Sequence, residues 1–168
     1  MYSVQKNAHA GSVNESLRIY WLLLPAACIV VLDEWLKARG LALLPDETAL
    51  VEPHVIDFAI HKNPGLAFDL PFRLELVIGL SILIGIVLAR AAYKTWRRRP
   101  KIAFSIFLII LGALGNLYDR IMYGFTVDYI IVMGRIAINF SDALILLGIV
   151  ALLILPAKRP RQGVDTSH

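Results

Sequence analysis

The chain alternates between four long apolar stretches and polar connections. The uncharged cores of these stretches cover residues 19–32, 76–89, 102–118 and 143–157. Each core has 14 to 17 residues, whereas a helix that crosses the ~30 Å hydrocarbon layer needs roughly 20. Polar residues flank each core, and lysine or arginine side chains at helix ends can extend to the interface. The pattern therefore predicts four transmembrane helices, with approximate spans 18–37, 72–93, 102–121 and 139–158.

The composition agrees with an integral membrane protein. Hydrophobic residues make up 58% of the chain and the mean hydropathy is +0.66, whereas soluble domains are about 45–50% apolar. Buried helices of a soluble protein are the alternative, but four of them in 168 residues would leave no polar faces. We therefore expect one integral membrane domain over residues 1–168. The single cysteine, Cys28, excludes a disulfide framework and a cysteine-ligated metal site.

The basic residues indicate the orientation. They gather between the second and third stretches, after the fourth and before the first: Arg90, Lys94, Arg97, Arg98, Arg99, Lys101; Lys158, Arg159, Arg161; Lys6, Arg18. Far fewer lie in the other connections. Because cytoplasmic loops collect lysine and arginine, both termini and the loop 94–101 are expected in the cytoplasm, and the loop 38–71 outside it. The net charge of +4 then fits membrane lipid headgroups as partners and does not indicate nucleic-acid binding.

The extracytoplasmic loop 38–71 is too long to be without structure. Its segment Val55–Ile60 reads as a strand, and Arg135–Ile138 could pair with it. The expected fold class is thus an all-α membrane protein of four transmembrane helices, with a small extracytoplasmic β-sheet cradle.

The carboxylates gather at one level of the predicted membrane domain. Asp33, Glu34, Asp119, Asp128 and Asp142 all fall at the outer ends of helices or in the short outer connection. Ionisable groups at membrane depth are costly and are functional candidates by default. Two neighbouring aspartates cannot both ionise easily, so one keeps its proton while the other can activate water. The sequence has no HExxH motif, and its serines lack an obvious base, so no metal or serine mechanism is indicated.

Each acid also has a purely structural interpretation. The segment Asn139–Asp142 reads as a helix start with an asparagine cap and an acid at the third position. Asp119 and Arg120 could form an interfacial ion pair, which is the interpretation that we favour for them. Asp128 could be an ordinary loop aspartate, and Asp33 an interfacial residue.

Several motifs resemble those of the lipoprotein signal peptidases (signal peptidase II). They are the segments Val31–Lys37, Asn63–Phe68, Gly112–Arg120, Val127–Tyr129 and Asn139–Ala143. They follow the order of that family, and the resemblance extends from about Ile19 to Ala157. Any one of these motifs is weak evidence, but together and in order they are specific.

The resemblance implies a four-helix aspartyl endopeptidase of the bacterial inner membrane with a β-sheet cradle and a mobile loop over its site. Such enzymes cut prolipoproteins on the N-terminal side of a diacylglyceryl-modified cysteine. By resemblance, the catalytic aspartates are Asp128 and Asp142. The supporting or substrate-binding residues are Asp33, Lys37, Asn63, Gly65, Asn116, Arg120 and Asn139. Of these, Asn63 and Arg120 would contact the substrate, while Asn116 and Asn139 would orient the site. No metal or cofactor is implied, and we expect a monomer.

The chain departs from the family pattern at two places. Ser141 stands where the family usually has alanine, and the stretch from Asp128 to Asp142 is short. Because Asp142 lies near a helix N-terminus, its ionised form should be favoured, which makes Asp128 the candidate proton holder. A small transporter is one alternative, although transport sites usually lie near the midplane between repeated halves. A catalytically inactive scaffold that binds lipidated helices is the other.

Overall fold

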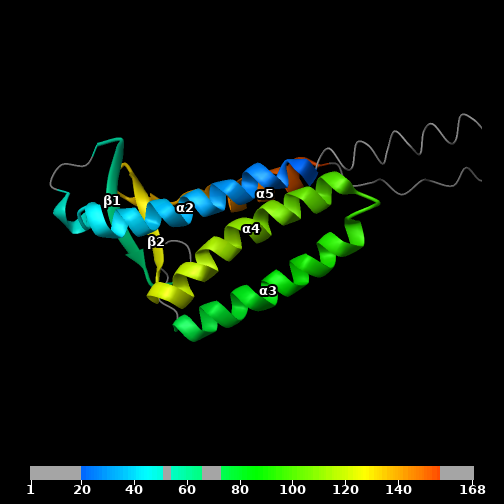
Figure 1. Ribbon diagram of the computed structural model, residues 1–168, viewed down its shortest axis with the longest axis horizontal. Coiled ribbons are helices and arrows are strands. Elements are labelled where there is room, and N and C mark those ends of the chain that lie inside the picture. Colours follow the sequence, from blue (N-terminus) through cyan, green and yellow to red (C-terminus); the bar gives the residue numbers. More distant parts are fainter. Residues whose placement is uncertain (1–19, 51–53, 66–72, 156–168) are drawn as a thin grey trace, which may run out of the picture.

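Four helices lie side by side, and a small β-sheet covers one end of them (Figure 1). The structure is a computed structural model that describes residues 20–50, 54–65 and 73–155. The helices are α2 (Leu23–Leu43), α3 (Leu74–Thr95), α4 (Pro100–Tyr123) and α5 (Phe140–Ile154). The strands are β1 (Ile56–Asn63), β2 (Thr126–Val132) and β3 (Ile136–Ile138), and a 3₁₀ helix, η1, covers Glu47–Ala49. The prediction of a mostly helical chain with a small sheet is confirmed.

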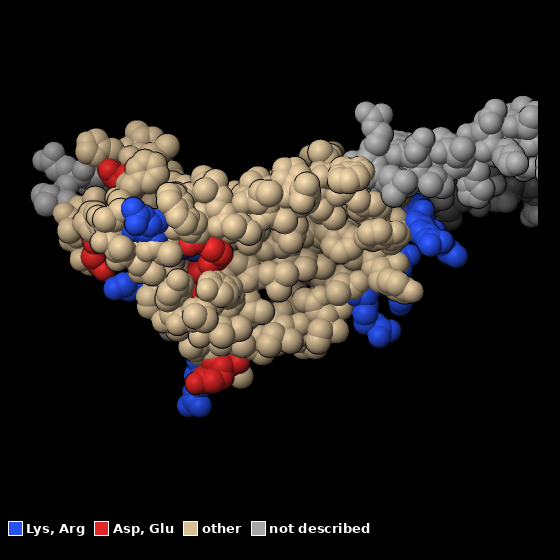
Figure 2. Space-filling view, in the orientation of Figure 1, with Lys and Arg blue, Asp and Glu red and all other residues tan. Residues whose placement is uncertain are grey.

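Two of the helices meet the length and composition expected of a membrane span. These are α3, with 22 residues and a hydropathy of 2.2, and α4, with 24 residues and a hydropathy of 1.8. Helix α5 is apolar but shorter, and α2 carries four charged residues in its second half. Figure 2 shows charged side chains gathered at the two ends of the molecule, with an uncharged band between them. This distribution is typical of a membrane protein.

Helix α4 packs against the other three helices, and its glycines allow a close approach to α5. A Cβ atom added at Gly112 would overlap the backbone oxygen of Ser141, and one added at Gly115 would overlap the Ser141 hydroxyl. On the opposite side of the contact, Gly148 of α5 lies directly against the backbone of Ser105. Small residues permit this backbone approach in membrane helices. The α4–α5 contact therefore fixes the height of the α5 N-terminus.

Helix α2 continues to Leu43, six residues past the end that the sequence indicated at Lys37. The additional turns pack beneath the sheet, where Leu41 joins the apolar cluster around Val127 and Tyr129. The helix stops at Leu44, whose extended backbone is what a following proline favours. The predicted loop 38–71 is thus helical over its first six residues.

The sheet has the strand order β1-β2-β3, and both pairings are antiparallel. Ile136 lies opposite Val132, so the predicted pairing of the 135–138 segment with the outer-loop strand is replaced by pairing with β2. The predicted strand Val55–Ile60 becomes β1, which is shifted to begin at Ile56 and extended to Asn63. Met133 and Gly134, both with positive φ, make the tight turn between β2 and β3. The short stretch between Asp128 and Asp142 therefore suffices for a complete hairpin.

Candidate active site

The N-terminus of α5 forms a capping box. The side-chain oxygen of Asn139 accepts a hydrogen bond of 2.8 Å from the backbone N–H of Asp142. In return, the Asp142 carboxylate accepts one of 3.3 Å from the backbone N–H of Asn139. This reciprocal arrangement satisfies two N–H groups that a helix start otherwise leaves free. The cap predicted from the sequence is present, and it holds the Asp142 side chain at the end of the helix.

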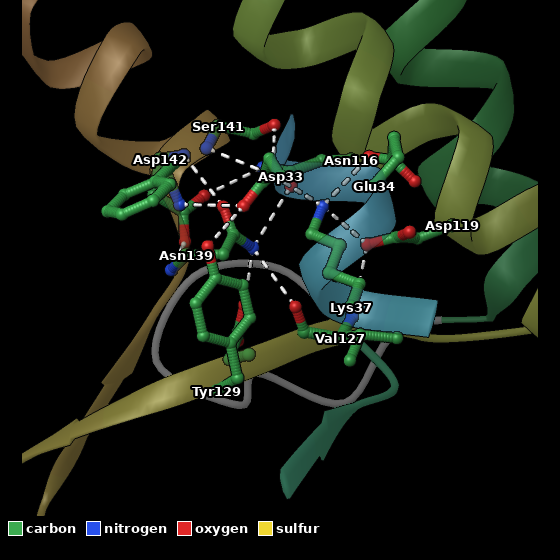
Figure 3. Close-up of polar contacts among 12 residues, drawn as sticks. Asp33, Glu34, Lys37, Asn116, Asp119, Val127, Tyr129, Asn139, Ser141 and Asp142 are labelled. Carbon is green, nitrogen blue, oxygen red and sulfur yellow. Dashed lines mark hydrogen bonds and ion pairs between the residues drawn. The ribbon is translucent and has the colours of Figure 1, made fainter. Parts of the chain in front are cut away.

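Asn139 also connects this cap to Asp128 on β2. Its side-chain nitrogen donates a hydrogen bond of 2.6 Å to the Asp128 carboxyl. The same nitrogen lies 3.2 Å from the side-chain oxygen of Asn116 on α4. Asn116 in turn donates a hydrogen bond of 2.7 Å to the Asp142 carboxylate. Two asparagines thus bridge the two aspartates that the sequence singled out. Figure 3 shows Asn116, Asn139 and Asp142 together at this point. Helix capping alone therefore does not account for the contacts of Asn139.

The two carboxyl groups have different surroundings. Asp128 is 2% exposed, and burial raises its pKa to about 7, with a further contribution from the negative charge of Asp142. The Asn139 hydrogen bond opposes this increase in the pKa of Asp128. The Asp142 carboxylate accepts two N–H donors, from Asn116 and from the Asn139 backbone. The neutral acid is therefore favoured at Asp128, and Asp142, with its two N–H donors, is the more readily ionised of the two.

Asp33 of α2 ties the first helix to the start of α5. Its carboxylate accepts hydrogen bonds from the backbone N–H groups of Phe140 and Ser141, at 3.0 and 3.2 Å. It also accepts from the Ser141 hydroxyl at 2.6 Å and from the Tyr129 hydroxyl at 2.7 Å. The serine that departs from the family pattern therefore has a partner, the buried carboxylate of Asp33. Tyr129 was not anticipated, because its partner lies 96 residues away in the sequence.

Lys37 lies one helical turn beyond Asp33 and is completely buried. Its ammonium group is 2.9 Å from Asp33, 2.8 Å from Asp119 of α4 and 3.1 Å from Glu34. Asp119 also accepts a hydrogen bond of 3.1 Å from the backbone N–H of Val127 on β2. The predicted ion pair between Asp119 and Arg120 is wrong, because consecutive residues on a helix point in different directions. Asp119 instead helps to hold β2 over the helices.

Arg120 points toward the turn that follows β1. Its guanidinium donates hydrogen bonds to the backbone oxygens of Gly65, at 3.1 Å, and of Asn116, at 3.2 Å. The side-chain oxygen of Asn63 accepts from the Gly65 N–H at 3.0 Å, which closes the turn. Arg120 Nε is buried and has no hydrogen-bond partner among the described residues. The remainder of this sequence motif, Leu66–Phe68, lies outside the described residues.

All nine site residues predicted from the sequence lie at the sheet-covered end of the helices. They form two groups of contacts. The first group contains Asp33, Lys37, Asn116, Asp128, Asn139 and Asp142. The second contains Asn63, Gly65 and Arg120, and the hydrogen bond from Arg120 to the Asn116 backbone joins it to the first. In the part of the chain that the structure describes, no group of three His, Cys, Asp or Glu side chains is placed to hold a metal ion. Two neighbouring carboxyl groups connected through two asparagines are an arrangement in which acids can share a proton.

Comparison with known proteins finds relatives in sequence and in fold. The chain is 38% identical to a lipoprotein signal peptidase of Xanthomonas axonopodis pv. citri, over 67% of this chain and 68% of that protein. It is 32% identical to one of Cellvibrio japonicus, over 80% of this chain and 85% of that protein. A bacterial membrane enzyme solved by the in meso method shares the fold, with a TM-score of 0.64 at 22% identity, covering 84% of this chain and 87% of that one.

A family model, described as signal peptidase (SPase) II, matches residues 25–157. That range includes every residue of the two contact groups described above. The protein therefore belongs to the signal peptidase II family, the lipoprotein signal peptidases.

Proposed function

We propose that this protein is a membrane aspartyl endopeptidase that removes the signal peptide from diacylglyceryl-modified prolipoproteins. It cuts on the N-terminal side of the lipidated cysteine, and Asp128 and Asp142 are its catalytic pair. The observation that carries the proposal is the bridge of Asn139 and Asn116 between the two carboxyl groups. A helix cap does not require Asn139 to contact Asp128 as well. A pair of acids that shares a proton, by contrast, requires both carboxyl groups to be held at a fixed position relative to each other.

The chemistry follows from the different surroundings of the two acids. The ionised carboxylate of Asp142 takes a proton from a water molecule, and the hydroxide formed attacks the carbonyl carbon of the scissile peptide. The neutral acid of Asp128 donates its proton to the carbonyl oxygen, which gives a tetrahedral diol. When the C–N bond breaks, Asp142 gives its proton to the amine of the lipidated cysteine while Asp128 takes a proton from one diol hydroxyl. The carbonyl of the new carboxyl group re-forms, and the pair again holds one shared proton.

Arg120 and Asn63 are placed to position the substrate. The buried Nε of Arg120, without a hydrogen-bond partner among the described residues, can donate to a substrate backbone carbonyl. The turn from Asn63 to Gly65 is fixed to the guanidinium, so it presents further backbone groups beside the same path. A buried donor without a partner is costly, and substrate binding would satisfy it.

Placement in the membrane also fits a lipidated substrate. We propose that all four helices cross the bacterial inner membrane, with both termini in the cytoplasm and the sheet at the extracytoplasmic surface. The basic connection between α3 and α4 lies at the opposite end of the helices from the sheet (Figures 1 and 2), as cytoplasmic loops should. The acids then lie where the scissile bond of a membrane-anchored peptide leaves the bilayer. One chain supplies both acids, so a monomer suffices.

The test is a gel-shift cleavage assay on a diacylglyceryl-modified prolipoprotein with the detergent-solubilised protein. We expect wild type to cut, while Asp128→Asn and Asp142→Asn lose at least about 10³-fold in rate, because each lacks one member of the pair. Asp57→Asn, on β1 outside the site, is the matched control and should keep its activity. Thermal unfolding of each variant establishes that it is folded.

Asn139→Ser separates capping from bridging. Serine is as good a cap as asparagine, but its side chain is shorter, and a hydroxyl oxygen that caps α5 does not extend to the place from which the Asn139 nitrogen donates to Asp128. We expect the cap to be kept, a loss of about 1–3 kcal/mol of stability from the buried acceptors that lose the Asn139 donor, and a large loss of kcat. Folded wild type that leaves the lipidated substrate intact, while a known lipoprotein signal peptidase cuts it, would overturn the proposed activity.

A further inference from the structure

Three ionisable side chains lie in a row across one edge of the sheet, and only Asp128 has been given a role so far. Glu47, in η1, bonds to His61 of β1, and the distance from the His61 Nδ1 to the Glu47 carboxylate is 2.6 Å. His61 lies directly opposite Asp128 in the β1–β2 ladder. The His61 side chain is 13% exposed and that of Glu47 is 38% exposed. The row therefore extends from a solvent-accessible carboxylate to a buried one.

A β-bulge brings the histidine into this row. Phe58 lies opposite Ile130, so a regular ladder would place Ile60 opposite Asp128. Instead, Ala59 and Ile60 together occupy the place opposite Tyr129, and His61 falls opposite Asp128. Bulges of this kind redirect side chains and are common beside active sites. Ile60 is left in the apolar cluster with Val127 and Tyr129.

Directly opposed residues project from the same face of the sheet, with Cβ atoms about 4.5–5.5 Å apart. The imidazole of His61 is therefore on the Asp128 side of β1. Asn63, two residues further along, is on that side as well, because side chains alternate along a strand. The charge of His61 lowers the pKa of Asp128, against the larger effect of burial.

We propose that His61, held by Glu47, is a positioning residue that supplies positive charge beside the catalytic Asp128. The inference rests on the proposed peptidase activity. A carboxylate in hydrogen-bond contact favours the protonated imidazolium. That cation faces Asp128 and limits how tightly the aspartate pair holds its shared proton. Glu47 acts through His61, because it contacts the ring and not the acid pair.

Other charges also act on this part of the site. The charged groups that face His61 or Asp128 from neighbouring elements are Asp46 beside η1, Lys37 of α2, Arg120 of α4 and Asp142 of α5. On β1 itself, Lys62 follows His61 directly. None of them changes in the variants used to test the proposal, so their contributions cancel in each comparison.

The chain contains a second histidine–carboxylate pair that serves as a matched control. His54 Nδ1 lies 3.0 Å from the Asp57 carboxylate, in a pair of the same chemistry. The His54 side chain, however, is 81% exposed, and Asp57 lies opposite Ile131 rather than an acid. A general effect of losing a sheet histidine would appear in His54→Gln as well as in His61→Gln.

The first experiment is the pH dependence of kcat/KM, which reports the ionisations of the free enzyme. Removing a positive charge favours the protonated form of the acid pair, so the pair loses its last proton at higher pH. We expect the alkaline limb of the kcat/KM profile to lie about 0.5–1 pH unit higher in His61→Gln than in wild type. KM should change little. Glu47→Gln should have a smaller effect in the same direction, and adding it to His61→Gln should give no further shift. His54→Gln should superimpose on wild type.

The second experiment does not depend on activity. Protein with ¹⁵N-labelled histidine is titrated by NMR in detergent micelles, and the His61 signal is assigned from its absence in His61→Gln or His61→Asn. In Asp128→Asn, which lacks the neighbouring carboxylate, we expect the His61 ring to titrate at lower pH than in wild type. The titration of His54 should not change.

The outcomes separate the two proposals. If wild type cuts its substrate and His61→Gln has an unchanged pH profile, the role of His61 is overturned and the peptidase assignment stands. The role of His61 is also overturned if its ring titrates at the same pH in Asp128→Asn as in wild type. If wild type cuts nothing, the peptidase proposal fails, and the ring titration still decides whether His61 and Asp128 are coupled.

Discussion

The amide of Asn139 performs two tasks that no other side chain of its size could combine. Its oxygen caps α5, while its nitrogen donates to the Asp128 carboxyl. Aspartate would supply the cap without a donor, and the single oxygen of the shorter serine side chain would not extend to both partners. At the scale of single residues, the separate donor and acceptor atoms of one amide group therefore fix Asp128 relative to the start of α5.

Asp128 should reduce the stability of the protein at neutral and alkaline pH. Its pKa is raised to about 7 in the folded state, against about 3.9 for an unperturbed aspartate. An acid with a raised pKa contributes stability below its unfolded pKa, and that contribution is lost as the pH rises through the folded value. We expect Asp128→Asn to melt several degrees above wild type at pH 8, equivalent to roughly 1–4 kcal/mol. The difference should disappear near pH 4, as measured by thermal unfolding in detergent. An equal difference at both pH values would contradict the raised pKa of Asp128.

At the scale of elements, the contact between α4 and α5 sets the position of Asp142. The N-terminal turn of α5 lies directly on the glycines of α4, and the backbone oxygen of Ser141 occupies the space that a side chain at Gly112 would need. Because that oxygen belongs to the backbone, it cannot move aside by changing a rotamer. The position of α5 along α4, and with it the helix cap and Asp142, depends on this close approach.

Replacing Gly112 by alanine should therefore disturb both stability and activity. The added Cβ would force α5 away from α4, and overpacking of this kind costs about 1–3 kcal/mol. Gly79→Ala on α3 is the matched control, because nothing lies within 4 Å of the added atom. It should leave activity unchanged and stabilise the helix slightly. Melting temperature and cleavage rate, measured together, test this prediction, and it is wrong if Gly112→Ala behaves like Gly79→Ala.

The sequence was informative where a feature depends on neighbouring residues. The Asn139–Asp142 cap and the apolar helices follow from local patterns, and motif resemblance located the residues that meet at the site. Contacts across the fold were not accessible in this way. The pairing of Lys37 with Asp119, the bond from Tyr129 to Asp33 and the opposition of His61 to Asp128 join distant positions. The last depends on a bulge, which shifts the register by one residue and has no signature in the strand pattern.

At the scale of the whole molecule, one buried ammonium group joins three elements. Lys37 of α2 contacts Asp119 of α4, and Asp119 in turn accepts from the backbone of β2. Asp33 also bonds to the start of α5, so polar contacts join the first helix to α4, β2 and α5. Its contact with β1 is apolar, through the cluster that contains Ile60. The network arranges these elements around the acids.

Loss of the Lys37 charge should therefore destabilise the protein as a whole. In Lys37→Met, buried Asp33 and Asp119 lose their counterion, and breaking a buried pair from one side costs about 3–5 kcal/mol. We expect a much lower melting temperature and a poor yield of folded protein. Lys62→Met, on the exposed side of β1, is the control and should behave like wild type. Adding Asp119→Asn to Lys37→Met should restore part of the stability, because it removes one uncompensated charge. A lack of any rescue would argue against the charge network.

The buried pair of Lys37 and Asp119 also has a consequence for the order of events during synthesis. The ribosome delivers α2 long before α4, so in the proposed topology Lys37 enters the membrane without Asp119. Asp33 lies one turn away on the same helix, within ion-pair distance of Lys37, so α2 can be inserted as a locally neutral segment. Asp119 is made much later, and Asp128 and Asp142 follow it in the chain. The proposed catalytic acids are therefore the last charged members of the site to be made.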